Sequence, residues 1–159
     1  MRRREREITE MKEILAILEK ADTIRLGIQG DTCPYIVPVS FALDKAGEKC
    51  AIYFHSAKAG LKVELLQHHP QVCFECDTFI KVEKTAYGIT TRYESVIGFG
   101  KCTVVEEPDE IQKGLKLLTE HYGYADYPLE RCGGLPHVNV YKILVDSVTG
   151  KRNLPVENE

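Results

Sequence analysis

Apolar residues recur along the chain at two periods, and each period predicts a type of secondary structure. Near the N-terminus they are spaced by three and four residues, at Ile8, Met11, Ile14, Leu15 and Leu18. This spacing places them on one face of a helix. We therefore expect a helix over residues 9–21, within an N-terminal helical segment 1–21, with Thr9 as its N-cap.

Strict alternation begins immediately afterwards and predicts a β-hairpin. Apolar residues alternate with polar or small ones over 24–28, and Gly30 and Asp31 then favour a turn. The returning strand, residues 35–43, contains Pro38. Because proline cannot donate a hydrogen bond to a neighbouring strand, this position indicates a sheet edge or a bulge.

The remaining elements follow the same two patterns and define a fold class. Helices are expected over 60–68 and 108–122, the latter with Gly123 as its C-cap. An irregular loop with Tyr124 and Tyr127 follows. Strands dominate and do not alternate strictly with helices, so the sequence predicts a mainly β fold, a small β-barrel with peripheral helices. The other strands are expected at 52–55, 71–77, 79–85, 93–106 and 138–146.

Length and composition favour a single globular domain. The chain has 159 residues, 43% of them hydrophobic, which is enough for one core. We expect one domain over 1–159 with a C-terminal tail over 147–159. The longest apolar runs fall short of the roughly 20 residues that span a bilayer, and no apolar segment follows the first arginines as in a secretory signal. We therefore expect a cytoplasmic protein with no membrane partner.

Charge and cysteine content argue against two further classes of protein. The net charge is −3, and residues 1–20 carry six basic and five acidic side chains, so we expect no nucleic-acid partner. Cys73 and Cys76 have redox or metal-site spacing, but they alternate within a predicted strand. Their thiols should point to opposite faces, and no second pair stands at ligand spacing. We therefore expect no metal site and free thiols.

The segment Tyr53–Lys62, YFHSAKAGLK, carries the first candidate chemistry. It leaves a strand at His55 and enters a helix beside Ser56, Lys58 and Lys62. The unpaired N–H groups of a helix start favour anions such as phosphate. An ordinary strand-to-helix connection with solvated lysines explains the same residues, and the residues alone leave both interpretations open.

A glycine-lined strand face is the second candidate for a binding site. Val96, Gly98 and Gly100 fall on one face of the predicted strand. Missing side chains allow a flat ligand to approach. They also suit a barrel bend where another strand crowds in, which is the interpretation that the residues alone favour.

Six segments together resemble a known family. The chain is similar to the FMN-binding split-barrel family related to pyridoxamine 5′-phosphate oxidase, in particular the branch of the nitroimidazole-resistance (Nim) proteins. The resemblance covers nearly the whole chain and rests on the order of its motifs. These are MRRREREI at 1–8, PYIVPVSF at 34–41, YFHSAKAGLK at 53–62, VCFECD at 72–77, YESVIGFGK at 93–101 and TGKRN at 149–153.

The resemblance implies a six-stranded split barrel that forms a homodimer and holds FMN in grooves at the subunit interface. His55, Ser56 and Lys62 would hold the FMN phosphate, with Lys58 nearby. The strand at 37–41 would follow the flavin ring with backbone hydrogen bonds; its residues are Val37, Pro38, Val39, Ser40 and Phe41. A third group would reach the cofactor or the partner subunit, and consists of Ser95, Val96, Gly98 and Arg152.

The resemblance further implies an FMN-dependent oxidoreductase. Its substrate would be a small aromatic molecule, with nitro compounds such as nitroimidazoles as candidates and NAD(P)H as a candidate electron donor. His55 is the candidate catalytic proton donor, although a plain cofactor contact explains it equally. A non-catalytic module that binds FMN or haem is the alternative. Oxidation of pyridoxamine 5′-phosphate itself is not expected, because the substrate-binding arginines and C-terminal segment of those oxidases are missing.

Overall fold

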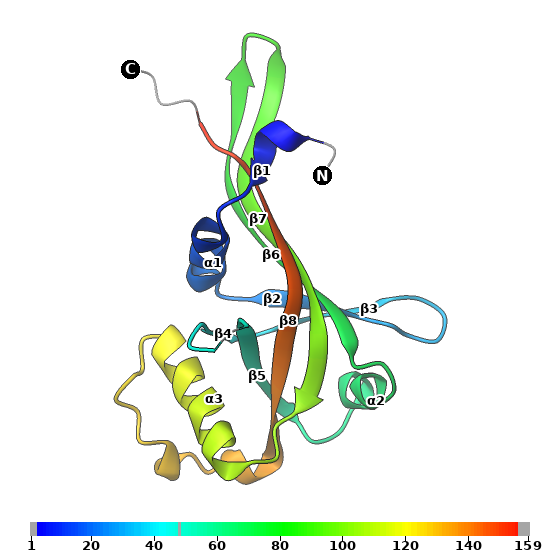
Figure 1. Cartoon of the computed structure of the whole chain (residues 1–159), viewed down its shortest axis with the longest axis vertical. Coiled ribbons are helices and arrows are strands. Elements are labelled where there is room, and N and C mark those ends of the chain that lie inside the picture. Colours follow the sequence, from blue (N-terminus) through cyan, green and yellow to red (C-terminus); the bar gives the residue numbers. More distant parts are fainter. Residues whose placement is uncertain (1–2, 48, 156–159) are drawn as a thin grey trace.

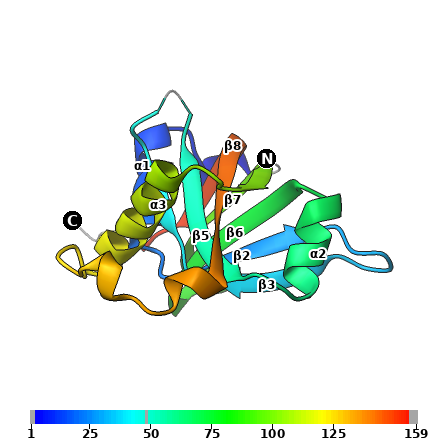
Figure 2. The same ribbon diagram turned by 90° about the horizontal axis from the view of Figure 1, so that it is seen from below.

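The computed structural model describes residues 3–47 and 49–155, which form a curved antiparallel sheet with helices around it (Figures 1 and 2). None of the helices in these residues has the length and apolar character to cross a bilayer. The strands are β1 (Glu7–Ile8), β2 (Ile24–Ile28), β3 (Tyr35–Val39), β4 (Ala42–Asp44), β5 (Ala51–Ala57), β6 (Gln71–Thr85), β7 (Gly88–Val104) and β8 (Val138–Asn153). The helices are α1 (Met11–Lys20), α2 (Leu61–His68) and α3 (Pro108–His121), with short 3₁₀ turns η1 (Arg4–Arg6), η2 (Leu129–Arg131) and η3 (Leu135–His137).

The sheet closes into a barrel through one bent segment. Its strand order is β3-β2-β6-β7-β8-β5-β4, with β1 added beside β8. The first and last strands of this order are separated along the chain only by Ser40 and Phe41, so they are two halves of one bent strand. Counted once, and without the two-residue β1, that strand makes a barrel of six main strands. The predicted split barrel with peripheral helices is confirmed.

The N-terminal segment differs from the prediction. The prediction of Thr9 as N-cap is wrong, because α1 begins at Met11 and Glu10 occupies the cap position without a side-chain hydrogen bond. The segment before it forms β1 instead of helix, with Ile8 opposite Gly150 of β8. Ile8 is thereby buried in the core. Burial of this side chain and strand pairing outweigh the local helical pattern.

Two other expected boundaries also move. Residues 147–153 of the expected C-terminal tail continue β8, because they pair with β7. The two strands expected at 71–77 and 79–85 form the single strand β6, with a register shift between Phe79 and Lys81. Together β6 and β7 extend well beyond the barrel as a long hairpin (Figure 1). Sequence alternation weakens at a bulge, so it suggested a break where the strand only kinks.

Side chains on the barrel strands alternate as the sequence predicted. Cys76 is buried and Cys73 lies on the opposite, half-buried face. Pro38 lies in β3, which pairs only with β2 among the described strands, so the predicted edge position is confirmed. Phe54 of β5 points into the core and stacks on Tyr141 of β8, with ring centroids 4.9 Å apart.

The glycine face of β7 is filled from within the same chain. Val96, Gly98 and Gly100 are all buried, so they lie on one face of the strand, as the alternation predicted. The ring of Phe74, on the neighbouring strand β6, lies directly over Gly98, and Gly100 lies against the backbone of Leu144 in β8. Of the two interpretations, barrel crowding therefore accounts for these glycines. Val96 and Gly98 have no side-chain surface to offer a ligand.

We predict that Gly98→Ala lowers the free energy of unfolding by about 1–3 kcal/mol, measured by urea denaturation. A β-carbon at Gly98 would lie 2.6 and 2.7 Å from Cε1 and Cε2 of the Phe74 ring. That ring is fully buried and has no room to move.

Gly133→Ala is the matched control, because a β-carbon there meets nothing within 4 Å. We expect its effect to stay within about 0.5 kcal/mol. Combining Gly98→Ala with Phe74→Leu should lose less stability than the sum of the two single changes. Additive losses would contradict the proposed contact.

Candidate functional site

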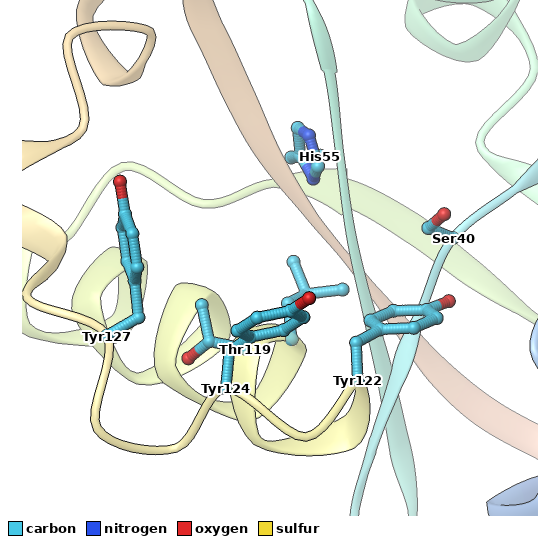
Figure 3. A pocket seen from close by; sticks show the side chains of 7 residues that line it. Ser40, His55, Thr119, Tyr122, Tyr124 and Tyr127 are labelled. Atoms are coloured by element: carbon cyan, nitrogen blue, oxygen red, sulfur yellow. The ribbon is translucent and has the colours of Figure 1, made fainter.

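A cavity of about 430 Å³ lies between the C-terminal end of α3, β5 and the bend that joins β3 to β4 (Figure 3). His55 reaches it from β5, where alternation points its ring out of the barrel while Phe54 points in. Ser40 reaches it from the bend. The structure therefore brings together two predicted site residues that are 15 positions apart in the sequence. The remaining lining residues come from α3 and the loop after it, and are Leu118, Thr119, Tyr122, Tyr124 and Tyr127.

A glycine-dependent turn ends α3 and shapes this side of the cavity. Gly123 has a φ of +83°, and its N–H donates to the Glu120 carbonyl at 3.0 Å. The Tyr124 N–H donates to the Thr119 carbonyl at 2.7 Å. This pair of hydrogen bonds is the Schellman motif, in which a left-handed glycine reverses the chain at a helix end. The cap residue is Tyr122, and the predicted Gly123 lies one position later.

Hydrogen bonds fix the end of α3 to the barrel. The Tyr122 hydroxyl donates to the Asp22 carbonyl at 2.6 Å and accepts from the Phe41 N–H at 3.1 Å. The neighbouring His121 ring contacts the Ala21 carbonyl through Nε2 at 2.9 Å. Phe41 was predicted to lie along a flavin ring. Its side chain is fully buried and its N–H is already bonded, so neither contacts a ligand in this arrangement.

Positive potential gathers on the other side of His55, at the start of α2. The helix follows Gly60, whose φ is +118°, and no side chain caps it. The N–H groups of Val63 and Glu64 are satisfied by the Gly60 carbonyl, which leaves those of Leu61 and Lys62 without a helix partner. An uncapped helix start of this kind favours an anion.

Lys62 adds a charge to this helix start. Its Nζ lies 5.8 Å from the centroid of the Phe54 ring, and it forms no salt bridge within residues 3–47 and 49–155. Burial lowers the pKa of Lys62. Burial, together with the charge of Lys62, also lowers the pKa of His55. The His55 shift shows that the charge of Lys62 acts on this ring. A phosphate group at the helix start would balance that charge.

Three further predicted residues lie away from this cavity. Lys58 lines a separate cavity beside α3. The Arg152 guanidinium pairs with Glu13 of α1, with 3.0 Å between Nη2 and Oε2. Ser95 of β7 stands opposite Lys151 of β8.

The distance along β8 separates Ser95 and Arg152 from His55. His55 pairs with Val140 near the start of β8, whereas Ser95 pairs with Lys151, eleven residues farther along. In extended strand this is about 36 Å, and Figure 1 shows β8 running the length of the barrel between these ends. A single chain does not bring Ser95 and Arg152 to the cavity.

The free edge of β3 offers backbone groups. Val37 is half-buried, Val39 is buried and Pro38 is exposed. Because β3 pairs only with β2 among the described strands, the N–H and C=O groups on its other side are not used in the sheet. Within the described residues, no cluster of three or more His, Cys, Asp or Glu side chains is arranged to hold a metal ion.

The tyrosines of the cavity were not predicted as site residues. Tyr122 is the last residue of the predicted helix over 108–122, and Tyr124 and Tyr127 lie in the irregular loop predicted after it. The glycine after the helix was the available signal, because it implies a chain reversal over the last helical turn.

Comparisons with known proteins connect the chain to one family and several structures. The family model described as pyridoxamine 5′-phosphate oxidase matches residues 10–152. A candidate 5-nitroimidazole antibiotic resistance protein from Bacteroides thetaiotaomicron is similar in structure, with a TM-score of 0.80, 28% identity, and coverage of 91% of this chain and 85% of that one. Among curated proteins, none matches the sequence.

Two flavin-related proteins share the fold at lower identity. The flavocytochrome Anf3 from Azotobacter vinelandii has a TM-score of 0.78 at 16% identity, covering 100% of this chain and 75% of that one. An FAD- and haem-binding protein from Mycobacterium smegmatis has a TM-score of 0.76 at 15% identity, covering 96% and 77%. At these identities the similarity shows the fold alone.

We predict that Tyr122→Phe lowers the free energy of unfolding by about 1–3 kcal/mol, measured by urea denaturation. The change removes the only partner of the Phe41 N–H in the described structure and the hydrogen bond to the Asp22 carbonyl. Tyr124→Phe is the control, since its hydroxyl has no intramolecular hydrogen bond in the described structure and its side chain is exposed. Equal losses in both variants would contradict the bracing role of Tyr122.

Proposed function

The chain belongs to the pyridoxamine 5′-phosphate oxidase family, and we propose that it binds FMN and acts as an FMN-dependent oxidoreductase on a small aromatic substrate. The observation that carries this proposal is the position of His55. Its ring lines an aromatic cavity that also contains Ser40, and the charge of Lys62, at the uncapped start of α2, acts on this ring. Flavin binding in similarly folded proteins supports the choice of cofactor.

The start of α2 fits the phosphate end of FMN. The N–H groups of Leu61 and Lys62 and the Lys62 ammonium would bind the phosphate oxygens, with the Ser56 hydroxyl beside them. A phosphate dianion would oppose the Lys62 charge, which together with burial lowers the pKa of His55. FMN ends in such a phosphate, which favours FMN as the flavin.

The edge of β3 and the ring of His55 fit the flavin and substrate side. Backbone groups along the free edge of β3 would face the rim of the flavin ring. Bound FMN supplies hydride and electron transfer, and the protein supplies position and polarity. The imidazole N–H can donate a hydrogen bond from either the neutral or the charged ring. We therefore assign it the role of hydrogen-bond donor to the substrate.

An apolar row on the outer face of the barrel supports a homodimer. Ile36, Gly27, Cys73 and Phe99 stand in register across β3, β2, β6 and β7. The two large side chains at its ends, Ile36 and Phe99, are 67% and 54% exposed. A second copy packed here would cover them. In such a dimer, Ser95 and Arg152 of one copy are available to a site built around His55 of the other.

We predict that the purified protein binds FMN and that Lys62→Ala weakens this binding by about 10- to 100-fold, measured by quenching of flavin fluorescence. The variant should remain a dimer in sedimentation. Riboflavin, which lacks the phosphate, should bind the variant and the unchanged protein equally, because Lys62 is assigned to the phosphate.

Lys116→Ala is the control for Lys62→Ala, because Lys116 is an exposed lysine on α3 whose only ion pair is within that helix. It should leave both affinities unchanged. If Lys62→Ala weakens FMN binding and riboflavin binding equally, the assignment of Lys62 to the phosphate is wrong. If neither FMN nor riboflavin binds, the cofactor assignment is refuted. A haem spectrum of the purified protein would replace FMN with haem.

We further predict turnover under anaerobic conditions. NADH or NADPH should bleach the visible flavin absorption, and a nitroaromatic acceptor should restore it. His55→Gln should lower kcat about 10- to 100-fold and leave FMN affinity within about twofold, as expected for a lost hydrogen bond to the substrate. A flavin that binds tightly and is never reduced by either nucleotide would show a carrier in place of an enzyme.

A further inference from the structure

The cavity beside His55 has an unusual balance of groups for a family named after a phosphorylated substrate. Seven residues line it, and none of them is Lys, Arg, Asp or Glu. Apart from tyrosine hydroxyls, its one titratable group is His55, whose pKa is lowered by burial and by Lys62. Burying a phosphate or carboxylate against such a lining is costly, because no fixed positive charge balances it.

Hydroxyl groups in the cavity divide into used and free ones. The Tyr122 hydroxyl is bonded on both sides, to the Asp22 carbonyl and the Phe41 N–H. The Thr119 hydroxyl donates to the Lys116 carbonyl at 2.8 Å. Within the described residues, the hydroxyls of Tyr124 and Tyr127 have no hydrogen-bond partner. The polar groups left for a ligand are these two hydroxyls, Ser40 and His55.

The two tyrosines with free hydroxyls also present free ring surface. Tyr124 is 66% exposed and Tyr127 is 45% exposed. In Figure 3 the Tyr124 and Tyr122 rings lie below His55, and Tyr127 stands at one side of the same space. Tyrosine loses little conformational freedom on binding and stacks well on flat rings.

The backbone after α3 holds these rings at the cavity. Tyr124 is placed by the Schellman turn around Gly123, and the Tyr127 N–H donates to the Tyr124 carbonyl at 3.1 Å. The loop is thereby fixed relative to the last turn of α3, which Tyr122 braces on the barrel. The backbone that carries these two rings is therefore positioned before any ligand binds, which reduces the ordering cost of binding.

We propose that Tyr124 and Tyr127 determine substrate selection, and that this cavity takes a planar aromatic ring with no phosphate or carboxylate. The inference rests on the proposed function and deepens it. The local cation, Lys62, is assigned to the cofactor phosphate, so a second phosphate on the substrate would have no counter-ion among the lining residues. The cavity volume of about 430 Å³ is within the range of small-molecule sites.

A pair of probes that differ in one charged group tests this selection. 4-Nitrobenzyl alcohol and 4-nitrobenzyl phosphate share the ring and the nitro group. We expect the alcohol to bind, by saturation-transfer NMR on the protein with FMN bound, at least tenfold more tightly than the phosphate. Phosphate binding as tight as alcohol binding would overturn the proposal.

Variants of the two tyrosines test which side chains select. Tyr124→Leu and Tyr127→Leu should each raise the dissociation constant and KM for the alcohol by about tenfold, through loss of ring contact, with kcat changed less than twofold. The two Tyr→Phe variants keep the ring and should stay within about threefold. Tyr87→Leu, on the exposed hairpin tip, should change nothing.

The readouts separate failure of the inference from failure of the proposed function. Probe binding is measured by NMR without turnover, and FMN affinity is measured independently for every variant. Loss of FMN reduction with probe selectivity intact would refute the enzyme assignment alone. Unchanged probe affinity in both leucine variants would overturn the inference alone, as would dissociation of the dimer by these variants, which would show that the tyrosines contact a second copy.

Discussion

Closure of the barrel at the bend between β3 and β4 is the constraint on which the site depends. Ser40 and Phe41 form this bend, and alternation sends Phe41 into the core and Ser40 outward to the cavity. The Tyr122 hydroxyl holds the Phe41 N–H, which the bend removes from the sheet ladder. One hydrogen bond therefore satisfies the backbone donor that the bend leaves unpaired and fixes α3 to the barrel at this point. An unsatisfied donor here would cost about as much as a large core defect.

Some parts of the site could be predicted from the sequence because they depend on local alternation, and others could not because they depend on long-range contacts such as the Tyr122 hydrogen bond. The outward position of His55, the burial of Val96 and Gly98, and the opposite faces of Cys73 and Cys76 follow from alternation within one strand, which is local. The Tyr122 contact joins residues 81 positions apart, and no local pattern encodes such a distance. The strand and helix pattern predicted a small barrel, and the family resemblance added its six-stranded split form, because the order of motifs carries long-range information that periodicity lacks.

The N-terminus shows the same limit in reverse. Local pattern favoured helix before Met11, yet Ile8 pairs with Gly150 near the other end of the chain and becomes buried. The glycine is required there, because a β-carbon at Gly150 would lie 2.8 Å from Cγ1 of Ile14. Gly150 of β8 leaves the space that Ile8 and Ile14 fill, so the two features are explained by the same contact. Taken alone, each of them suggests a loop or a helix end.

Charge divides the site into two regions with different tasks. Lys62 and the uncapped start of α2 place positive charge close enough to act on His55. The tyrosine cavity, which His55 also lines, has no Lys, Arg, Asp or Glu among its lining residues. In the proposed function the cofactor phosphate occupies the first region, and the flat, uncharged ring of the substrate occupies the second. His55 lies at the boundary, so its protonation responds to whatever anion occupies the first region. In the proposed function, cofactor binding and the polarity presented to the substrate would thereby be coupled through one imidazole ring.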